Sequence, residues 1–234
     1  MKKNNDTRKE SWSKVDSKKL YNVVEGFDLA KEVAFAKFDE TFDIAFRLGV
    51  DPRHADQMIR GAIVMPAGTG KKVNVVVITS GENIAKAEAA GADLVGGDDI
   101  IQKIQGGWMD FDRVIATPDM MGKIGRVARI LGPRGLMPNP KLGTVTTDVE
   151  KAVSEQKAGK VEYRTEKTGI VHVPFGKKSF SNEQLMENFK AIAGAISRAK
   201  PASAKGTYIK SVVISTSMGP GVKLDTNDIV AVLK

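Results

Sequence analysis

The segment Leu131–Lys141, with the sequence LGPRGLMPNPK, contains the residues whose types and spacing most clearly suggest chemistry. Its three prolines lack an N–H donor and its two glycines loosen the backbone, so neither a helix nor a strand interior fits it. The pattern predicts a stiff loop that presents Arg134 and Lys141 on a nearly fixed main chain. Rigid cationic donors lose little entropy on binding, which favours a phosphate-binding surface. The alternative is a solvated turn that carries a few charges.

Basic residues continue on the N-terminal side of this loop. Lys123, Arg126 and Arg129 lie in a stretch with helical character, and residues 122–142 contain no Asp or Glu. The net charge of the chain is +8, and residues 159–234 hold 12 basic but only 6 acidic residues. Because each neutralised phosphate releases counterions, such an excess favours a nucleic-acid partner. The alternative is charge that serves solubility alone.

Catalytic and cofactor motifs are incomplete. Residues 67–72 (AGTGKK) resemble the end of a P-loop, but its first Gly and the Ser or Thr after its Lys are missing. No dinucleotide fingerprint follows the apolar run Val73–Thr79, and His54 and His172 do not have a metal-ligand spacing. The chain has no Cys, which excludes thiolate catalysis and disulfides. We predict that it is not an enzyme and has no cofactor, metal or small-molecule substrate. An α/β enzyme that binds a nucleotide at its strand ends is the rival interpretation.

Two segments near the N-terminus show the periods of a helix and a strand. Val15–Ala36 has apolar residues at helical spacing, with a predicted break at Gly26. Phe38–Leu48 alternates, which predicts a strand with one buried face. Glu40 is in phase with the apolar side chains, and a buried carboxylate needs partners. We therefore expect Glu40 at the solvated end of the strand, the alternative being a hydrogen-bonded position inside a site.

The middle of the chain has a different pattern of apolar residues. Val73–Thr79 is an almost continuous β-branched run, typical of a strand covered on both faces, and helices and strands alternate after it. Alternating strands return after residue 158, and Ser181 and Gln184 form a capping-box pattern that predicts the start of a helix. The predicted fold is therefore two-domain α/β. A discontinuous α+β domain (1–68 and 159–234) carries an inserted parallel α/β domain (69–158).

The composition bears on the location of the protein. No apolar run approaches the roughly 20 residues that span a bilayer, and the polar N-terminal segment lacks the apolar region of a secretory signal. We expect a cytoplasmic protein without a membrane partner. The segment before Val15 is expected either to follow phosphates or to be disordered.

Five motifs, taken together, resemble the bacterial large-subunit ribosomal protein L1 family. They occur in order along nearly the whole chain. The motifs are Lys37–Thr41, Gly96–Ile101 with Gly107–Phe111, Leu131–Lys141, Lys167–Gly169 and Thr216–Pro220.

The resemblance implies both a fold and a function. It implies an RNA-binding domain made from both termini and an inserted Rossmann-like domain, in agreement with the division predicted above. It further implies a structural constituent of the large ribosomal subunit, bound to the rRNA arm that forms the mobile stalk beside the exit site. There the protein would assist release of deacylated tRNA. It would also repress translation of its own operon by binding a similar RNA fold in the mRNA.

The resemblance also implies which residues contact RNA. The implied rRNA-binding residues are Lys37, Phe38, Thr41, Lys167, Thr168, Gly169, Thr216, Ser217, Met218 and Gly219. Hydroxyl groups and exposed main chain can contact 2′-OH groups and phosphates, while Phe38 and Met218 offer apolar surface to sugars or bases. For Phe38 the alternative is ordinary core packing. Because the main rRNA surface is expected in the discontinuous domain, we predict a contact with a second RNA from the basic residues of the insert. These are Arg126, Arg129, Arg134 and Lys141.

Overall fold

The computed structural model describes residues 2–233. The chain divides into two compact units. The terminal unit comprises the chain up to Gly70 together with the chain from Val161 onward. The insert unit comprises Lys71–Lys160.

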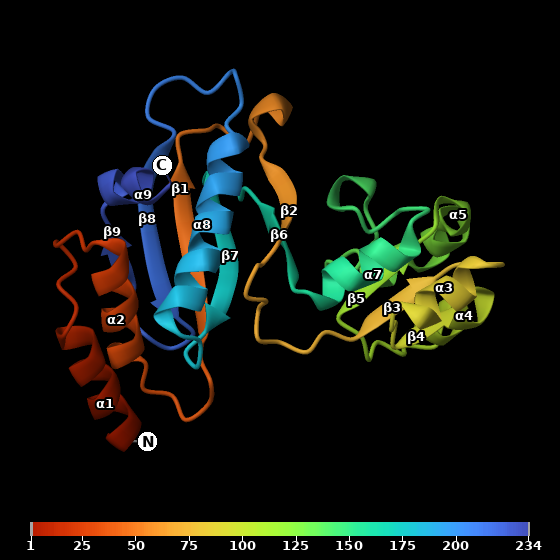
Figure 1. The fold of residues 1–234 in the computed structure, drawn as a ribbon, viewed down its shortest axis with the longest axis horizontal. Helices are drawn as coiled ribbons and strands as arrows, with labels where there is room; N and C mark the ends of the chain where they lie inside the picture. The colour runs from red at the N-terminus through yellow and green to blue at the C-terminus, as the bar shows by residue number, and fades with distance from the viewer. Residues whose placement is uncertain (1, 234) are drawn as a thin grey trace. The chain divides into compact units, whose positions relative to one another are not determined.

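The terminal unit is built on a four-stranded antiparallel sheet in the order β7-β1-β8-β9 (Figure 1). Its strands are β1 (Thr41–Leu48), β7 (Ile170–Lys177), β8 (Ile209–Thr216) and β9 (Val222–Leu224). Helices α2 (Val23–Val33) and α8 (Asn182–Arg198) contact each other and cover one face of the sheet. Alternate residues of β1 are buried, as the sequence predicted, because only this face is covered.

The core of the terminal unit lies between this sheet and the two helices. Phe27 of α2 packs against Phe175 of β7 and Phe189 of α8, with ring centroids 5.7–5.8 Å apart. The capping box predicted at the start of α8 is present, with both reciprocal hydrogen bonds between Ser181 and Gln184. This cap sets the start of the helix, whose apolar stripe then faces the sheet.

Smaller elements complete the terminal unit. They are α1 (Lys2–Ser13), a 3₁₀ turn (Ala55–Gln57), the paired strands β2 (Arg60–Val64) and β6 (Lys160–Arg164), and α9 (Thr226–Val232). Of the two expectations for the segment before Val15, disorder is wrong for residues 2–13, which form α1, and a contact with phosphates stays a prediction. There Arg8 stacks on the Trp12 ring one helical turn away, at 5.1 Å.

The helix predicted over Val15–Ala36 is too long. It begins only at Val23, where the Asn22 side chain accepts a hydrogen bond from the N–H of Glu25. Gly26 does not break the helix. It lies where a Cβ would come within 2.5 Å of Leu224, so it allows α2 to approach β9 closely.

The insert unit contains a three-stranded parallel sheet in the order β4-β3-β5. Its strands are β3 (Val75–Ile78), β4 (Leu94–Gly96) and β5 (Arg113–Ala116). Its helices are α3 (Asn83–Ala89), α4 (Asp98–Gln105), α5 (Met121–Ile124), α6 (Ala128–Leu131) and α7 (Val149–Lys157). Short 3₁₀ turns occupy Pro118–Met120, Gly125–Val127 and Pro140–Leu142.

Strand β3 is buried on both sides, which explains its continuous apolar run. Val76 and Ile78 belong to one apolar cluster with the isoleucines of α4. Val75 and Val77 belong to another with Val153 of α7. The molecule is therefore a mixed α/β protein with a parallel sheet, and the predicted α/β class is confirmed at that level. No helix among residues 2–233 is long and apolar enough to cross a membrane.

Candidate nucleic-acid interface

One group of the predicted RNA-binding residues lies where β1 begins and β8 ends. We call it the strand-start surface; it consists of Lys37, Phe38, Thr41, Ser217, Met218 and Gly219, and the predicted Thr216 lies among them but is buried. Antiparallel pairing places Phe42 of β1 opposite Thr216 of β8. The N–H of Thr41 then donates to Ser217 Oγ at 3.0 Å, across 176 positions of the chain. The sheet register thus brings together two segments that are remote in the sequence.

Two large apolar side chains are exposed on this surface. Phe38 is 56% exposed and Met218 is 49% exposed. Strand β1 begins only at Thr41, so Phe38 precedes the sheet and does not enter the core. The core-packing alternative for Phe38 is therefore wrong. Exposed aromatic and thioether groups beside hydroxyls and main-chain groups suit contacts with bases and sugars.

Glu40 lies beneath this surface, and our expectation that it sits at a solvated strand end is wrong. It is completely buried. Its Oε1 accepts a hydrogen bond from the N–H of Ala36 at 2.7 Å, and its Oε2 accepts one from the N–H of Met218 at 3.0 Å. These donors give the buried carboxylate the partners that it requires.

The same contacts determine the charge of Glu40. Burial raises the pKa of its carboxyl group. The N–H groups of Met218 and Ala36 lower this pKa, and so do the nearby Thr216 hydroxyl and Lys178 ammonium. Together these four groups outweigh the effect of burial. The net result is a pKa below the ordinary value of 4.5. Glu40 is therefore ionised at neutral pH.

Thr216 and Gly219 shape the turn that follows β8. Thr216 is only 3% exposed, and its hydroxyl has no hydrogen bond of standard geometry within the described chain. A Cβ at position 219 would collide with Thr216 Oγ1, so the turn requires glycine there. Thr216 is thus placed beneath the surface, whereas Ser217 and Met218 are exposed on it.

Two lysines beside the strand-start surface were not predicted from the sequence. Lys177 at the end of β7 lies opposite Thr41 and donates to its Oγ1 at 2.9 Å. Lys178 donates from Nζ to the carbonyl of Ala34 at 2.7 Å. The pair of lysines is visible in the sequence, but the sequence alone does not show that it lies beside β1. Strand pairing is what places these lysines next to the residues of β1.

The other predicted residues, Lys167–Gly169, lie at the opposite end of β1. The carbonyl of Gly169 accepts a hydrogen bond from the N–H of Leu48, the last residue of that strand, at 2.9 Å. An eight-residue strand is roughly 25 Å long. The structure therefore does not bring Lys167–Gly169 together with the strand-start surface. Gly169 has a φ of 79°, and a Cβ there would press against the carbonyls of Leu48 and Val50.

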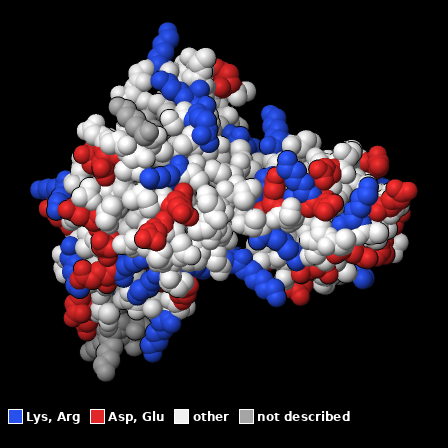
Figure 2. All heavy atoms as spheres, viewed as in Figure 1, with Lys and Arg blue, Asp and Glu red and all other residues white. Residues whose placement is uncertain are grey.

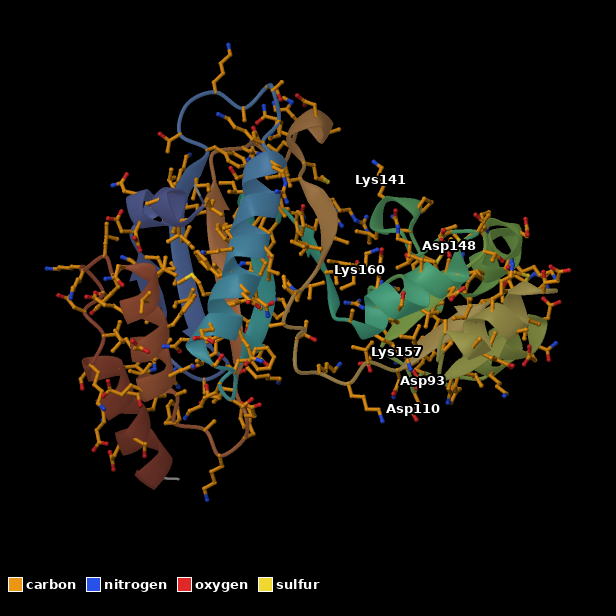
Figure 3. The ribbon with its side chains drawn as sticks, viewed as in Figure 1. Asp93, Asp110, Lys141, Asp148, Lys157 and Lys160 are labelled. Atoms are coloured by element: carbon orange, nitrogen blue, oxygen red, sulfur yellow. The ribbon has the colours of Figure 1, made fainter. Side chains whose placement is uncertain are left out.

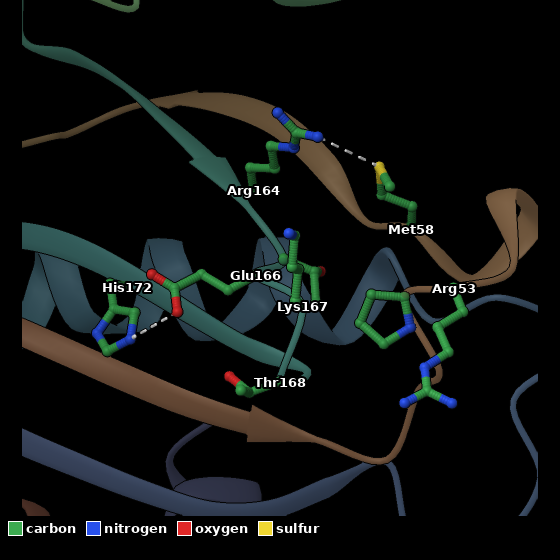
Figure 4. Close-up of a pocket in the computed structure, with 9 residues that line it drawn as sticks. Arg53, Met58, Arg164, Glu166, Lys167, Thr168 and His172 are labelled. Atoms are coloured by element: carbon green, nitrogen blue, oxygen red, sulfur yellow. Dashed lines mark hydrogen bonds and ion pairs between the residues drawn. The ribbon is translucent and has the colours of Figure 1, made fainter.

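Residues 166–169 form a tight turn between β6 and β7, closed by an antiparallel bridge between Thr165 and Val171. Around this hairpin the chain forms a concave site, which we call the hairpin groove (Figure 4). It is lined by Pro52, Arg53, Met58, Arg164, Thr165, Glu166, Lys167, Thr168 and His172. His172 Nε2 lies 3.9 Å from a Glu166 oxygen, and an Arg164 nitrogen lies 3.9 Å from the Met58 sulfur. The arginines and His172 were not predicted as site residues, because three separate segments have to fold together before they meet.

The predicted second contact lies in the insert unit. The four predicted cations, Arg126, Arg129, Arg134 and Lys141, are exposed and have no ion pair or side-chain hydrogen bond within the described chain. Some other lysines of this unit form ion pairs, whereas Lys72, Lys86, Lys103 and Lys151 are exposed and have none within the described chain. Lys157 lies 3.3 Å from Asp93 (Figure 3), and Lys160 lies 2.7 Å from Glu155. Figure 2 shows the two signs of charge interspersed over the visible face of this unit.

The Leu131–Lys141 loop has the internal support that its composition predicts. The N–H of Leu136 donates to the carbonyl of Leu131, and Gly135 adopts a φ of 70°. Asn139 Oδ1 accepts from the N–H of Lys141 at 2.9 Å, which caps the following 3₁₀ turn. Figure 3 shows the Lys141 side chain extending away from this loop.

No cluster of three or more His, Cys, Asp or Glu that could hold a metal ion occurs between residues 2 and 233.

Residues 30–220, most of the chain, match the Ribosomal protein L1p/L10e family. The chain belongs to this family. It is therefore a ribosomal protein of the large subunit that binds rRNA, and the family is structural rather than enzymatic. The predicted family is confirmed, and with it the prediction of an rRNA-binding ribosomal protein.

The matched range of the L1p/L10e family includes both ends of β1. It extends from within α2 to Pro220, the residue that follows the strand-start surface. It also contains the hairpin groove and the whole insert unit. Each surface described above therefore belongs to the part of the chain that this family shares.

Proposed function

We propose that this protein binds the rRNA arm of the mobile stalk through the strand-start surface, with the hairpin groove as a second contact. The observation that carries this proposal is the pair of exposed apolar side chains, Phe38 and Met218, on a surface held by hydrogen bonds from two chain segments. A rigid surface loses little entropy when RNA binds. We also propose that the two compact units are domains, and that the terminal unit carries the stalk affinity.

The test is a filter-binding titration with stalk rRNA. Phe38→Ala and Met218→Ala should each weaken binding by about tenfold, within the range found for loss of a stacking or apolar contact to a base. Val230→Ala is the matched control, because Val230 is 51% exposed but belongs to α9. It should bind like the wild type. Unchanged affinity in both surface variants would show that RNA binds elsewhere.

For the insert unit, we propose a contact with tRNA that assists release of deacylated tRNA from the exit site. The unpaired cations Arg126, Arg129, Arg134 and Lys141 support this role. Cations that already have a carboxylate partner must give it up before they bind phosphate, whereas these four need not.

We propose further that the strand-start surface represses translation of the protein's own operon by binding a similar fold in its mRNA. One surface can serve both RNAs only if they compete for it. An operon mRNA fragment should therefore displace stalk rRNA, and Met218→Ala should weaken both complexes by the same factor. Simultaneous binding of both RNAs would contradict a shared site.

A further inference from the structure

Glu40 is the one completely buried acidic side chain among residues 2–233, and it bridges the two segments of the strand-start surface. Its two carboxylate oxygens accept one N–H from each segment, from Ala36 before β1 and from Met218 after β8. The main-chain carbonyl of Glu40 accepts a third N–H, from Lys178 at 2.8 Å. A single residue therefore holds three parts of the chain around this surface.

A carboxylate is suited to this bridging position. It has two acceptor oxygens and no donor, so it can satisfy two N–H groups at the same time. A glutamine has the same shape but offers one acceptor and one NH₂ group, so it would leave one of the two N–H groups facing a donor. An alanine would leave both N–H groups without this acceptor.

The bridge also orients the main chain of the exposed turn. In a trans peptide the N–H and the preceding carbonyl point in opposite directions. The described chain contains no cis peptide. Because the N–H of Met218 points toward Glu40, the carbonyl of Ser217 points away from it. Ser217 and Met218 are exposed, and a carbonyl oxygen there is an acceptor for a 2′-OH or an exocyclic amino group.

We propose that Glu40 is a positioning residue for RNA recognition, holding Phe38 and Met218 in their binding arrangement before RNA arrives. The inference rests on the proposed function of the strand-start surface. Electrostatics alone would give Glu40 the opposite effect, since a negative charge beneath the surface repels phosphate. The sign of the change in affinity on neutralising Glu40 therefore separates the two roles.

The experiment compares rRNA affinity in Glu40→Gln with that in a destabilised control. Tyr208→Phe removes a buried hydrogen bond, from the Tyr208 hydroxyl to the carbonyl of Ile196 at 2.9 Å, near the other end of β8. Glu40→Gln should weaken rRNA binding by about tenfold, as expected when a buried donor loses its acceptor. Tyr208→Phe should bind within about twofold of the wild type. Unchanged or tighter binding by folded Glu40→Gln would overturn the proposal.

The rRNA affinities of Phe38→Ala and Met218→Ala, and amide hydrogen exchange of the wild type, distinguish the possible outcomes. If Phe38→Ala and Met218→Ala weaken binding while Glu40→Gln does not, only the positioning role fails. If all three variants bind like the wild type, the proposed surface itself is wrong. Amide hydrogen exchange of the wild-type protein does not depend on whether a variant folds. The amides of Ala36 and Met218 should be protected before RNA is added, and rapid exchange at both would overturn a preformed bridge.

Discussion

The strand-start surface and the Leu131–Lys141 loop both present proposed RNA-binding groups on a rigid main chain, but their rigidity has different origins. In the loop it is local, because prolines, a left-handed glycine and an asparagine cap act within eleven consecutive residues. In the strand-start surface it is non-local, because Glu40 accepts hydrogen bonds from segments that β1 and β8 bring together. Local rigidity can be read from composition, whereas non-local rigidity depends on sheet register.

The largest expected effect comes from separating the two units. Residues 71–160 alone should bind stalk rRNA about 1,000-fold more weakly than the full chain, near the lower limit of the usual difference between specific and non-specific binding. Residues 1–70 joined to 161–234 by a short Gly-Ser linker should bind within about threefold of it. Filter binding measures both. A hundredfold loss in the joined chain would mean that the insert contributes directly to stalk binding.

The second prediction concerns acid. Because the pKa of Glu40 is lowered in the folded state, its ionised form stabilises the fold above about pH 4.5, and this contribution is lost as the pH falls below that value. At pH 7, Glu40→Gln should lower the free energy of unfolding by about 1–3 kcal/mol, the cost of a buried donor without its acceptor. The difference from the wild type should shrink toward pH 3. Urea titrations at both pH values measure it, and a constant difference would contradict an ionised Glu40.

The third prediction tests the hairpin groove. Arg53→Gln and Arg164→Gln should each weaken stalk rRNA binding a few-fold and reduce the salt slope by about one, if each side chain contacts one phosphate. Both side chains are exposed and glutamine keeps a polar group there, so the unfolding temperature should not change. A salt slope equal to that of the wild type would remove the groove from the RNA interface.

The smallest effect on stalk rRNA affinity is expected from substitutions in the Leu131–Lys141 loop. Arg134→Gln with Lys141→Gln should leave stalk rRNA affinity within a few-fold while release of deacylated tRNA from ribosomes slows. Lys157→Gln is the matched control, since Lys157 pairs with Asp93 in the same unit. A collapse of stalk rRNA binding in the folded double variant would contradict the proposed division of labour between the units.

Several elements could be predicted from the sequence because short-range rules decide them. The period of β1 from Phe42 onward, the doubly buried run of β3 and the capping box at Ser181 all depend on neighbouring residues. The sequence analysis placed the start of α2 at Val15 and the start of β1 at Phe38, and both starts were wrong. Asn22 caps the helix and β1 begins only at Thr41. Apolar periodicity alone did not reveal either boundary.

The sequence by itself determined the α/β class, the family motifs and the stiff basic loop, since each depends on residues close together in the chain. Only the tertiary structure decided the environment of Glu40. It also decided the separation of Lys167–Gly169 from Thr216–Gly219 along β1. The physical reason is that a buried carboxylate is stable only where donors converge on it. Those donors come from Ala36 and Met218, which antiparallel pairing of β1 with β8 brings to the same place.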